Sequence, residues 1–136
     1  MTDKNLLVIT PHRKEPGKQR IAAYCRVSSR SDEQLNSLTN QINFYRSLFE
    51  NDDTVVFVGI YAEEGLSGTQ AESRPQFMKM IEDCRSGLID CIRTKSVSRF
   101  GRNTVDTLIY TRELRSLGID VFFEKENIHS TESSGE

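Results

Sequence analysis

The chain contains 136 residues, a length that fits one domain, and 36% of them are hydrophobic, which is enough for a single core. Its 18 basic and 20 acidic residues leave a net charge of −2, which taken alone weighs against a nucleic-acid partner. No apolar run approaches the ~18 residues of a membrane span and residues 1–20 contain no signal-peptide core, so we expect a cytoplasmic protein without membrane contact. The three cysteines lack the paired spacing of zinc ligands, which predicts buried thiols, no metal and no disulfide.

Residues 1–19 are polar and contain two prolines, which predicts a flexible lead-in. Four runs rich in apolar and β-branched residues predict strands, in residues 20–28, 54–61, 89–94 and 119–124. Three stretches between them have apolar residues at three- and four-residue steps and predict helices, in residues 35–49, 75–87 and 103–118. This alternating order predicts an α/β fold with a mostly parallel central sheet of about four to five strands flanked by helices.

Local signals add detail to two of these helices. Ser31 and Gln34 form a capping-box pattern before the first helix. In the third helix, Val105, Leu108 and Ile109 share one face, which predicts that this face packs on the core.

The polar stretch 62–74 contains two glycines and is predicted to be a mobile loop that carries Arg74. The adjacent acids Glu63–Glu64 and Asp52–Asp53 are interpreted as solvated, because adjacent residues lie on opposite faces of a strand or in loops.

The first predicted strand carries polar residues on one of its two faces. Side chains alternate along a strand, so Tyr24, Arg26 and Ser28 share one side while the opposite side is apolar. Ligands of α/β proteins gather outside the carboxyl ends of the strands, and Ser28 stands at such an end. A hydroxyl beside a guanidinium could attack a phosphorus centre while the cation holds its oxygens. The alternative is that Ser28 begins a turn and Arg26 makes a structural ion pair.

A second group of charged residues follows the third predicted strand. Residues 85–102 carry five basic side chains against one acidic one, and residues 119–136 carry one basic and five acidic ones, so the overall charge hides a local basic site. The loop 95–102 is expected on the same side of the sheet as Ser28. The planar forks of Arg99 and Arg102 are suited to bind phosphate oxygens bidentately. Considered alone, this loop could also be a solvated basic face.

Several common catalytic arrangements are absent from the sequence. The only histidines are His12 and His129, in the lead-in and near the end of the chain, so a Ser-His triad is not expected. Neither phosphate-binding pattern, GxxxxGK[ST] or GxGxxG, occurs. A serine near arginines without a histidine base suits transfer of a phosphodiester to a hydroxyl, where positioning and charge stabilisation do most of the work.

The segment YCRVSS, residues 24–29, resembles the YxRVS signature of the serine site-specific recombinases, the resolvase/invertase family. Further segments follow in the family's order: SLTNQ, EEGLSGT, ESRPQF and KSVSRFGRNTVDT, at residues 37–41, 63–69, 72–77 and 95–107. The basic loop and the ending FFEKENIHS look most like the large serine recombinases, the transposon and phage integrases. The resemblance implies a resolvase-like catalytic domain in residues 20–129, and the composition of residues 130–136 predicts a disordered tail.

By this resemblance Ser28 is the nucleophile, which attacks a DNA phosphodiester and leaves a 5′-phosphoserine link and a free 3′ hydroxyl. The arginines that surround the scissile phosphate in the family, and its active-site glutamine, match Arg26, Arg74, Arg99, Arg102 and Gln41. The same arginines and Lys95 are the residues expected to contact DNA. Resolvases carry an aspartate at the position of Ser98, so no acid is expected to act there. The group that takes the proton from Ser28 stays open.

The resemblance also implies partners: double-stranded DNA at recombination sites, a homodimer, and a tetramer at synapsis in the full-length protein, with no cofactor. Family members continue into a long dimer helix and DNA-binding domains, so we expect an isolated catalytic domain with weak sequence-specific binding. One alternative is a non-catalytic DNA-binding or assembly module whose arginines only hold phosphates. Another is a small-molecule phosphatase or phosphotransferase that uses the same anion pocket.

Overall fold

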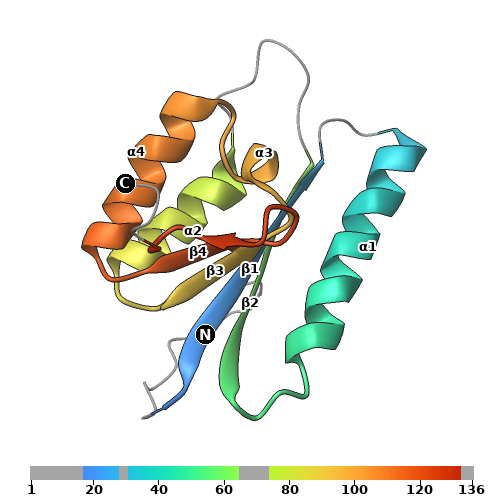
Figure 1. Ribbon diagram of the computed structural model, residues 1–136. Helices are drawn as coiled ribbons and strands as arrows, with labels where there is room; N and C mark the ends of the chain where they lie inside the picture. Colours follow the sequence, from blue (N-terminus) through green and yellow to red (C-terminus); the bar gives the residue numbers. More distant parts are fainter. Residues whose placement is uncertain (1–16, 28–30, 65–73, 133–136) are drawn as a thin grey trace.

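The centre of the fold is a five-stranded sheet (Figure 1). The computed structural model describes residues 17–27, 31–64 and 74–132. In spatial order the strands are β2 (Val55–Glu64), β1 (Gln19–Val27), β3 (Cys91–Thr94), β4 (Asp120–Phe123) and β5 (Ile128–His129). The first four pair in parallel and β5 pairs with β4 in antiparallel orientation, which confirms the predicted α/β fold with a mostly parallel sheet.

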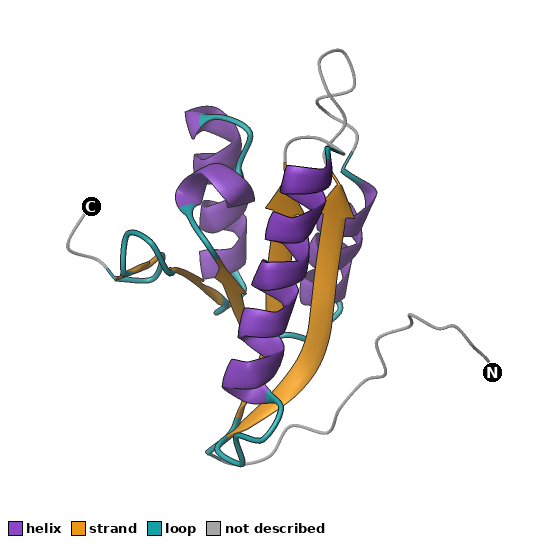
Figure 2. Ribbon diagram, turned by 90° about the vertical axis from the view of Figure 1, so that its right-hand side faces the viewer, coloured by secondary structure: helices purple, strands orange, loops and turns teal. Residues whose placement is uncertain are grey.

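Helices cover both faces of this sheet. They are α1 (Asp32–Phe49), α2 (Pro75–Arg85), α3 (Val97–Phe100) and α4 (Thr104–Ser116). α1 lies on one face, and α2 and α4 lie on the other (Figures 1 and 2). The single turn α3 falls within the predicted basic loop 95–102. In the part of the chain that the structure describes, no helix has the length and apolar character needed to cross a membrane.

Short-range signals set the ends of these helices. The Ser31 side chain accepts a hydrogen bond from the backbone N–H of Gln34, as the predicted capping pattern requires. α2 and α4 are followed by Gly87 and Gly118 with φ of 81° and 80°, a conformation that side chains with a Cβ rarely adopt. These signals are local, so the sequence alone is enough to locate them.

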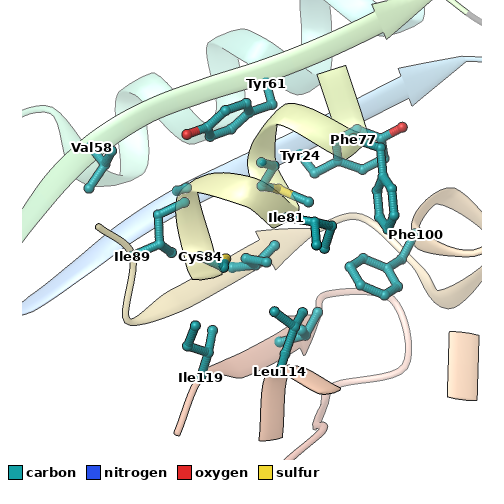
Figure 3. Packing of buried hydrophobic residues seen from close by; sticks show 14 of the residues in the cluster. Tyr24, Val58, Tyr61, Phe77, Ile81, Cys84, Ile89, Phe100, Leu114 and Ile119 are labelled. Carbon is teal, nitrogen blue, oxygen red and sulfur yellow. The ribbon is translucent and has the colours of Figure 1, made fainter. Parts of the chain in front are cut away.

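The core divides into two clusters on the two faces of β1. Its residues Ile21, Ala23, Cys25 and Val27 pack with α1, whereas Ala22 and Tyr24 pack with the residues of α2 and α4. Figure 3 shows the second cluster, in which the ring of Tyr24 lies beside that of Phe77. The predicted alternation of β1 is therefore confirmed, with the apolar side toward α1 and Tyr24 on the opposite side.

The three cysteines are free and buried, as predicted: Cys25, Cys84 and Cys91. Burial raises the pKa of each of these thiols to about 12. They therefore act as small apolar groups of the core at neutral pH.

The predicted inner face of the helix at 103–118 is wrong. Val105, Leu108 and Ile109 are 63%, 44% and 54% exposed, while Thr111 and Leu114 of the same helix are buried. The Thr111 hydroxyl donates to the Thr107 carbonyl one turn earlier, so a threonine can face the core here without an unpaired hydroxyl. Leu114 then provides the main apolar contact of α4 with the sheet.

Two boundaries also differ from the prediction. β2 continues to Glu64, so residues 62–64 belong to a strand and not to the predicted loop. Ser130 and Thr131, assigned to a disordered tail, hydrogen-bond to Val121 and Asp120 of β4. Residues 133–136, like most of the predicted lead-in, lie outside the described residues.

Candidate functional site

The candidate site lies at the carboxyl ends of β1 and β3, where α3 packs against β1 (Figure 1). β1 ends at Val27, one residue before the predicted nucleophile. Ser28 itself lies outside the described residues, as do residues 65–73 of the predicted mobile loop. The other predicted site residues, Arg26, Gln41, Arg74, Lys95, Arg99 and Arg102, are all described.

Arg26 connects β1 to α3 through its side chain. Its Nη2 donates to the Ser98 carbonyl at 2.7 Å and its Nε donates to the Arg99 carbonyl at 3.0 Å. The carbonyls at the end of a helix lack partners within it and carry the negative end of the helix dipole, which suits a guanidinium. Arg26 thus holds α3 in place by bonding to carbonyls, and no carboxylate of the described residues forms the ion pair with it that the sequence suggested as an alternative.

Gln41 holds the backbone of the same residue from the other side of the sheet. Its Oε1 accepts from the Arg26 N–H at 3.3 Å, and its Nε2 donates to the Arg26 carbonyl at 3.2 Å. The Gln41 side chain is buried. Gln41 therefore fixes the end of β1 directly before Ser28.

Arg74 was predicted to belong to a mobile loop, but it is buried and stands at the start of α2. It occupies the N-cap position of α2, and its exposed fraction is 7%. Its Nη2 donates to the Phe100 carbonyl, and its guanidinium carbon lies 3.8 Å from the centroid of the Phe77 ring. Burial lowers the pKa of Arg74, and the neighbouring positive charge of Arg26 acts in the same direction. A guanidinium nevertheless stays protonated in proteins.

Two arginines from different elements therefore hold three successive carbonyls of α3. Ser98 and Arg99 bond to Arg26, and Phe100 bonds to Arg74. The start of α3 is fixed as well, because the Ser96 hydroxyl accepts from the Arg99 N–H and lies 3.0 Å from the Ser98 hydroxyl. The serine that replaces the resolvase aspartate thus takes part in the local structure of α3.

The remaining basic residues are placed differently from one another. Among the described residues, the Arg99 guanidinium has no hydrogen-bond or ion-pair partner, although its side chain is only partly exposed. Arg102 forms an ion pair with Asp106 of α4, with Nε and Oδ2 2.9 Å apart. Lys95 lines a pocket of about 410 Å³ between α1 and the ends of β3 and β4, which Gln41 also lines. The sequence analysis placed all these basic residues in one phosphate-binding group, whereas Lys95 lines the pocket beside α1.

Glu63 is a member of this region that sequence reasoning missed. It was interpreted as solvated, but it is buried, with an exposed fraction of 6%. Its carboxylate accepts from the Tyr24 hydroxyl at 2.7 Å and from the backbone N–H of Gln76 at 2.8 Å. The partners lie far away in sequence, so adjacency to Glu64 gave no indication of burial. A usable signal was the start of α2, where no ordinary capping residue precedes Pro75.

The arrangement combines cations and buried polar contacts around the end of β1. Burial raises the pKa of the Tyr24 hydroxyl, with the charge of Arg74 opposing the shift and the hydrogen bond to Glu63 adding to it. Tyr24 therefore stays a neutral donor toward Glu63. The guanidiniums of Arg26, Arg74 and Arg99 are the groups here that can hold an anion, and their planar forks suit phosphate oxygens.

Comparison with known proteins shows which family the chain is similar to. Residues 21–136 match the profile described as "Resolvase, N terminal domain". The structure is similar to that of a resolvase family site-specific recombinase from Streptococcus pneumoniae, with 28% identity and a TM-score of 0.72 over 86% of this chain and 79% of that chain. It is also similar to the N-terminal catalytic domain of TP901-1 integrase, with 25% identity and a TM-score of 0.61 over 86% of this chain and 85% of that one.

A more distant likeness concerns the fold alone. The C-terminal catalytic domain of ISC1926 TnpA, an IS607-like serine recombinase, aligns with a TM-score of 0.63 and 18% identity over 77% of this chain and 70% of that chain. No curated protein sequence matches the chain. The family match covers the motifs YCRVSS, SLTNQ and KSVSRFGRNTVDT, and the resemblance seen in them is confirmed. The chain belongs to the resolvase family, as a serine recombinase catalytic domain.

Proposed function

We propose that this domain carries out site-specific DNA recombination with Ser28 as the nucleophile. The observation that supports this most strongly is the convergence of Arg26 and Arg74 on α3, next to the end of β1 that leads into Ser28. A hydroxyl at that end would meet guanidiniums from three elements. Family membership supports recombination as the process, and the phosphoserine chemistry is the part that we propose.

In the proposed reaction the Ser28 oxygen attacks the phosphorus of a DNA phosphodiester. The bond from phosphorus to the 3′ oxygen breaks, and a bond from phosphorus to the serine oxygen forms. The serine loses its proton and the departing 3′ oxygen gains one, which leaves a 5′-phosphoserine link and a free 3′ hydroxyl. Rejoining is the reverse attack by a 3′ hydroxyl. Because one phosphodiester replaces another, the step needs no external energy source and no cofactor.

The arginines have separate roles in this proposal. Arg99 has no partner among the described side chains and backbone groups, so its full fork is available to the phosphate. Arg26 uses Nε and Nη2 to hold α3, and we assign its Nη1, which has no partner in the described part of the chain, to the phosphate. Arg74 is fixed by Phe77 and Phe100 and adds a buried positive charge. Such preorganised charge stabilises the extra negative charge of the transition state.

Outside the reacting atoms, we propose double-stranded recombination sites as the substrate. We also propose a homodimer that pairs into a tetramer at synapsis. Arg102 and Lys95 are assigned to DNA contact away from the phosphorus, since Arg102 shares its charge with Asp106 and Lys95 lies in the pocket beside α1.

The experiment that tests the proposal compares cleavage with binding. The intact protein is incubated with its recombination-site DNA, and covalent adducts are separated from non-covalent complexes on a denaturing gel. We expect Ser28→Ala to lose the adduct and to keep binding, with binding that weakens as salt is raised. An adduct that survives in Ser28→Ala rejects Ser28 as the nucleophile. A wild-type protein that binds and never forms an adduct favours the non-catalytic module instead.

A further inference from the structure

We propose that Glu63 is a positioning residue that caps α2 from the neighbouring strand and thereby fixes Arg74 at the site. The inference rests on the proposed function, because Arg74 matters only if a phosphate is held there. It is carried by three hydrogen bonds to one buried carboxylate, none of which the sequence indicated.

The start of α2 lacks the usual means of capping. A helix leaves its first N–H groups without partners inside the helix, and a Ser, Thr, Asp or Asn at the N-cap normally accepts from them. In α2 that position holds Arg74, whose side chain makes no capping bond, and Pro75 has no N–H to satisfy. The N–H groups of Gln76 and Phe77 therefore need an acceptor from elsewhere.

Glu63 supplies this acceptor from the end of β2. Its Oε2 accepts from the Gln76 N–H at 2.8 Å, and its Oε1 accepts from the Phe77 N–H at 3.4 Å. A carboxylate at the positive end of the helix dipole adds a favourable electrostatic term. Because the cap comes from another strand, position 74 is free to carry an arginine.

The same carboxylate ties the cap to β1. The Tyr24 hydroxyl donates to Oε1 of Glu63 at 2.7 Å, and Tyr24 is fully buried. The Tyr24 ring meets the Phe77 ring edge-on with centroids 5.4 Å apart, and Figure 3 shows these two rings next to each other. Phe77 in turn carries the guanidinium of Arg74 on its face. Glu63 thus fixes the residue whose ring supports Arg74.

Charge balance gives a second reason for an acid at this place. Arg74 is buried close to Arg26, which disfavours its charge, and the Glu63 carboxylate opposes this effect. Removing the negative charge while keeping the shape should therefore loosen Arg74. Glu50 is the control, since it is an exposed glutamate that follows α1 on the other face of the sheet.

The test uses the 136-residue chain and nuclear magnetic resonance of Glu63→Gln and Glu50→Gln. The Nε–H signal of Arg74 is identified by its loss in Arg74→Lys. In Glu63→Gln we expect this signal and the Gln76 and Phe77 amides to exchange with solvent roughly fivefold faster or more, as for the loss of a cap. The amide of Ile92 in β3 should be unchanged, and Glu50→Gln should match the wild type. Unchanged exchange of all three groups in Glu63→Gln overturns the proposal.

A second variant separates capping from general loss of structure. In Glu63→Gln/Arg74→Ser, a serine returns to the N-cap, so protection of the Gln76 and Phe77 amides should recover relative to Glu63→Gln. If the double variant is no better protected than the single one, Glu63 does not act as the cap. This comparison holds even if Glu63→Gln is only marginally folded.

The activity arm uses the intact protein with its DNA. Glu63→Gln should form the covalent adduct roughly a hundredfold more slowly, since small displacements of a positioning group have effects of that order. DNA binding by Glu63→Gln and the adduct rate of Glu50→Gln should stay close to wild type. A wild-type adduct rate in Glu63→Gln contradicts the positioning role. A wild-type protein that forms no adduct rejects the proposed function instead, and the exchange data still decide whether Glu63 holds Arg74.

Discussion

Gln41 and Arg26 form a two-way hydrogen bond at the end of β1, with the amide of Gln41 both accepting from and donating to the Arg26 backbone at 3.3 Å and 3.2 Å. The Gln41 amide thus pairs with both the N–H and the carbonyl of Arg26, as the backbone of a neighbouring strand would. It fixes the direction of the chain as it leaves the sheet toward Ser28. In the proposed reaction, the role of Gln41 would be to position the chain that leads to Ser28.

The first prediction follows from the two directions of this contact. The substitution Gln41→Glu keeps the acceptor, loses the donor and turns a negative charge toward the Arg26 carbonyl, so it should lower the free energy of unfolding by about 1–3 kcal/mol. Denaturant unfolding of the 136-residue chain measures this. Asn40→Asp, at an exposed neighbour on α1, makes a parallel change and should have little effect. Equal stability of the two variants would contradict the role of Gln41.

Gly101 leads to a second prediction, on the position of α3. A Cβ at this residue would lie 1.9 Å from Oγ1 of Thr107, closer than any real contact. Gly101→Ala should therefore destabilise the protein by about 1–3 kcal/mol through overpacking, because α3 and α4 must separate. Gly101→Ala/Thr107→Ala removes the nearest atom and should regain part of the loss. If the unfolding curves of the two variants coincide, contact with the Thr107 side chain is not the cause of the lost stability.

A third prediction concerns Arg99, whose guanidinium has no hydrogen-bond or ion-pair partner among the described residues. Arg99→Lys keeps the charge and loses the bidentate fork, so the rate of adduct formation should fall roughly a hundredfold. Arg112→Lys, on the exposed surface of α4, is the control and should react as the wild type does. The measurement is single-turnover cleavage by the intact protein. Full activity of Arg99→Lys would mean that a point charge is sufficient at this position.

The buried thiols give a prediction on pH. The pKa of each cysteine is raised from 9.0 to about 12, so the folded protein holds thiol protons that the unfolded chain releases. A raised folded-state pKa stabilises the fold below about pH 9, and this contribution is lost as the pH rises toward about 12. Denaturant midpoints should therefore fall across this window. Replacing all three cysteines by alanine should flatten the fall, and an equally steep fall would assign it to other groups.

The same burial predicts slow chemistry at these thiols. At about pH 8 the folded chain should react with iodoacetamide far more slowly than the unfolded chain, because the thiolate is the reactive form. Rapid modification of the native protein at Cys25 would show that β1 opens on the timescale of the reaction.

The parts of the fold that depend on neighbours in sequence were predictable, and those that depend on distant partners were not. The alternation of β1 follows from the period of its own sequence. The cap at Ser31 involves only its side chain and the N–H of Gln34, three residues later. The prediction for the inner face of α4 was wrong because three exposed apolar residues resemble a core stripe, whereas the residues that face the core, Thr111 and Leu114, include only one aliphatic side chain. Apolar residues on a surface are common, so such a stripe is a weak indication of burial.

The residues of the candidate site also fall into those that could be located from the sequence and those that could not. The argument from the carboxyl ends of parallel strands placed Arg26 and Arg99 correctly at one edge of the sheet, because Arg26 lies near the end of β1 and Arg99 follows β3. Glu63 was missed because its burial depends on Tyr24 and on the start of α2, residues that meet it only in the folded chain. Arg74 was expected in a mobile loop because the bond that fixes its guanidinium, to the Phe100 carbonyl, joins residues that are far apart in the sequence.

The most direct test of the central claim is mass spectrometry of the adduct between the intact protein and its recombination-site DNA. Trypsin cleaves after Arg26 and after Arg30, and the peptide of residues 27–30 contains two serines. We expect fragment ions that place the nucleotide phosphate on Ser28, and the same adduct in Ser29→Ala. A nucleotide found on Ser29, or DNA cleavage without a modified 27–30 peptide, would contradict the assignment of Ser28 as the nucleophile.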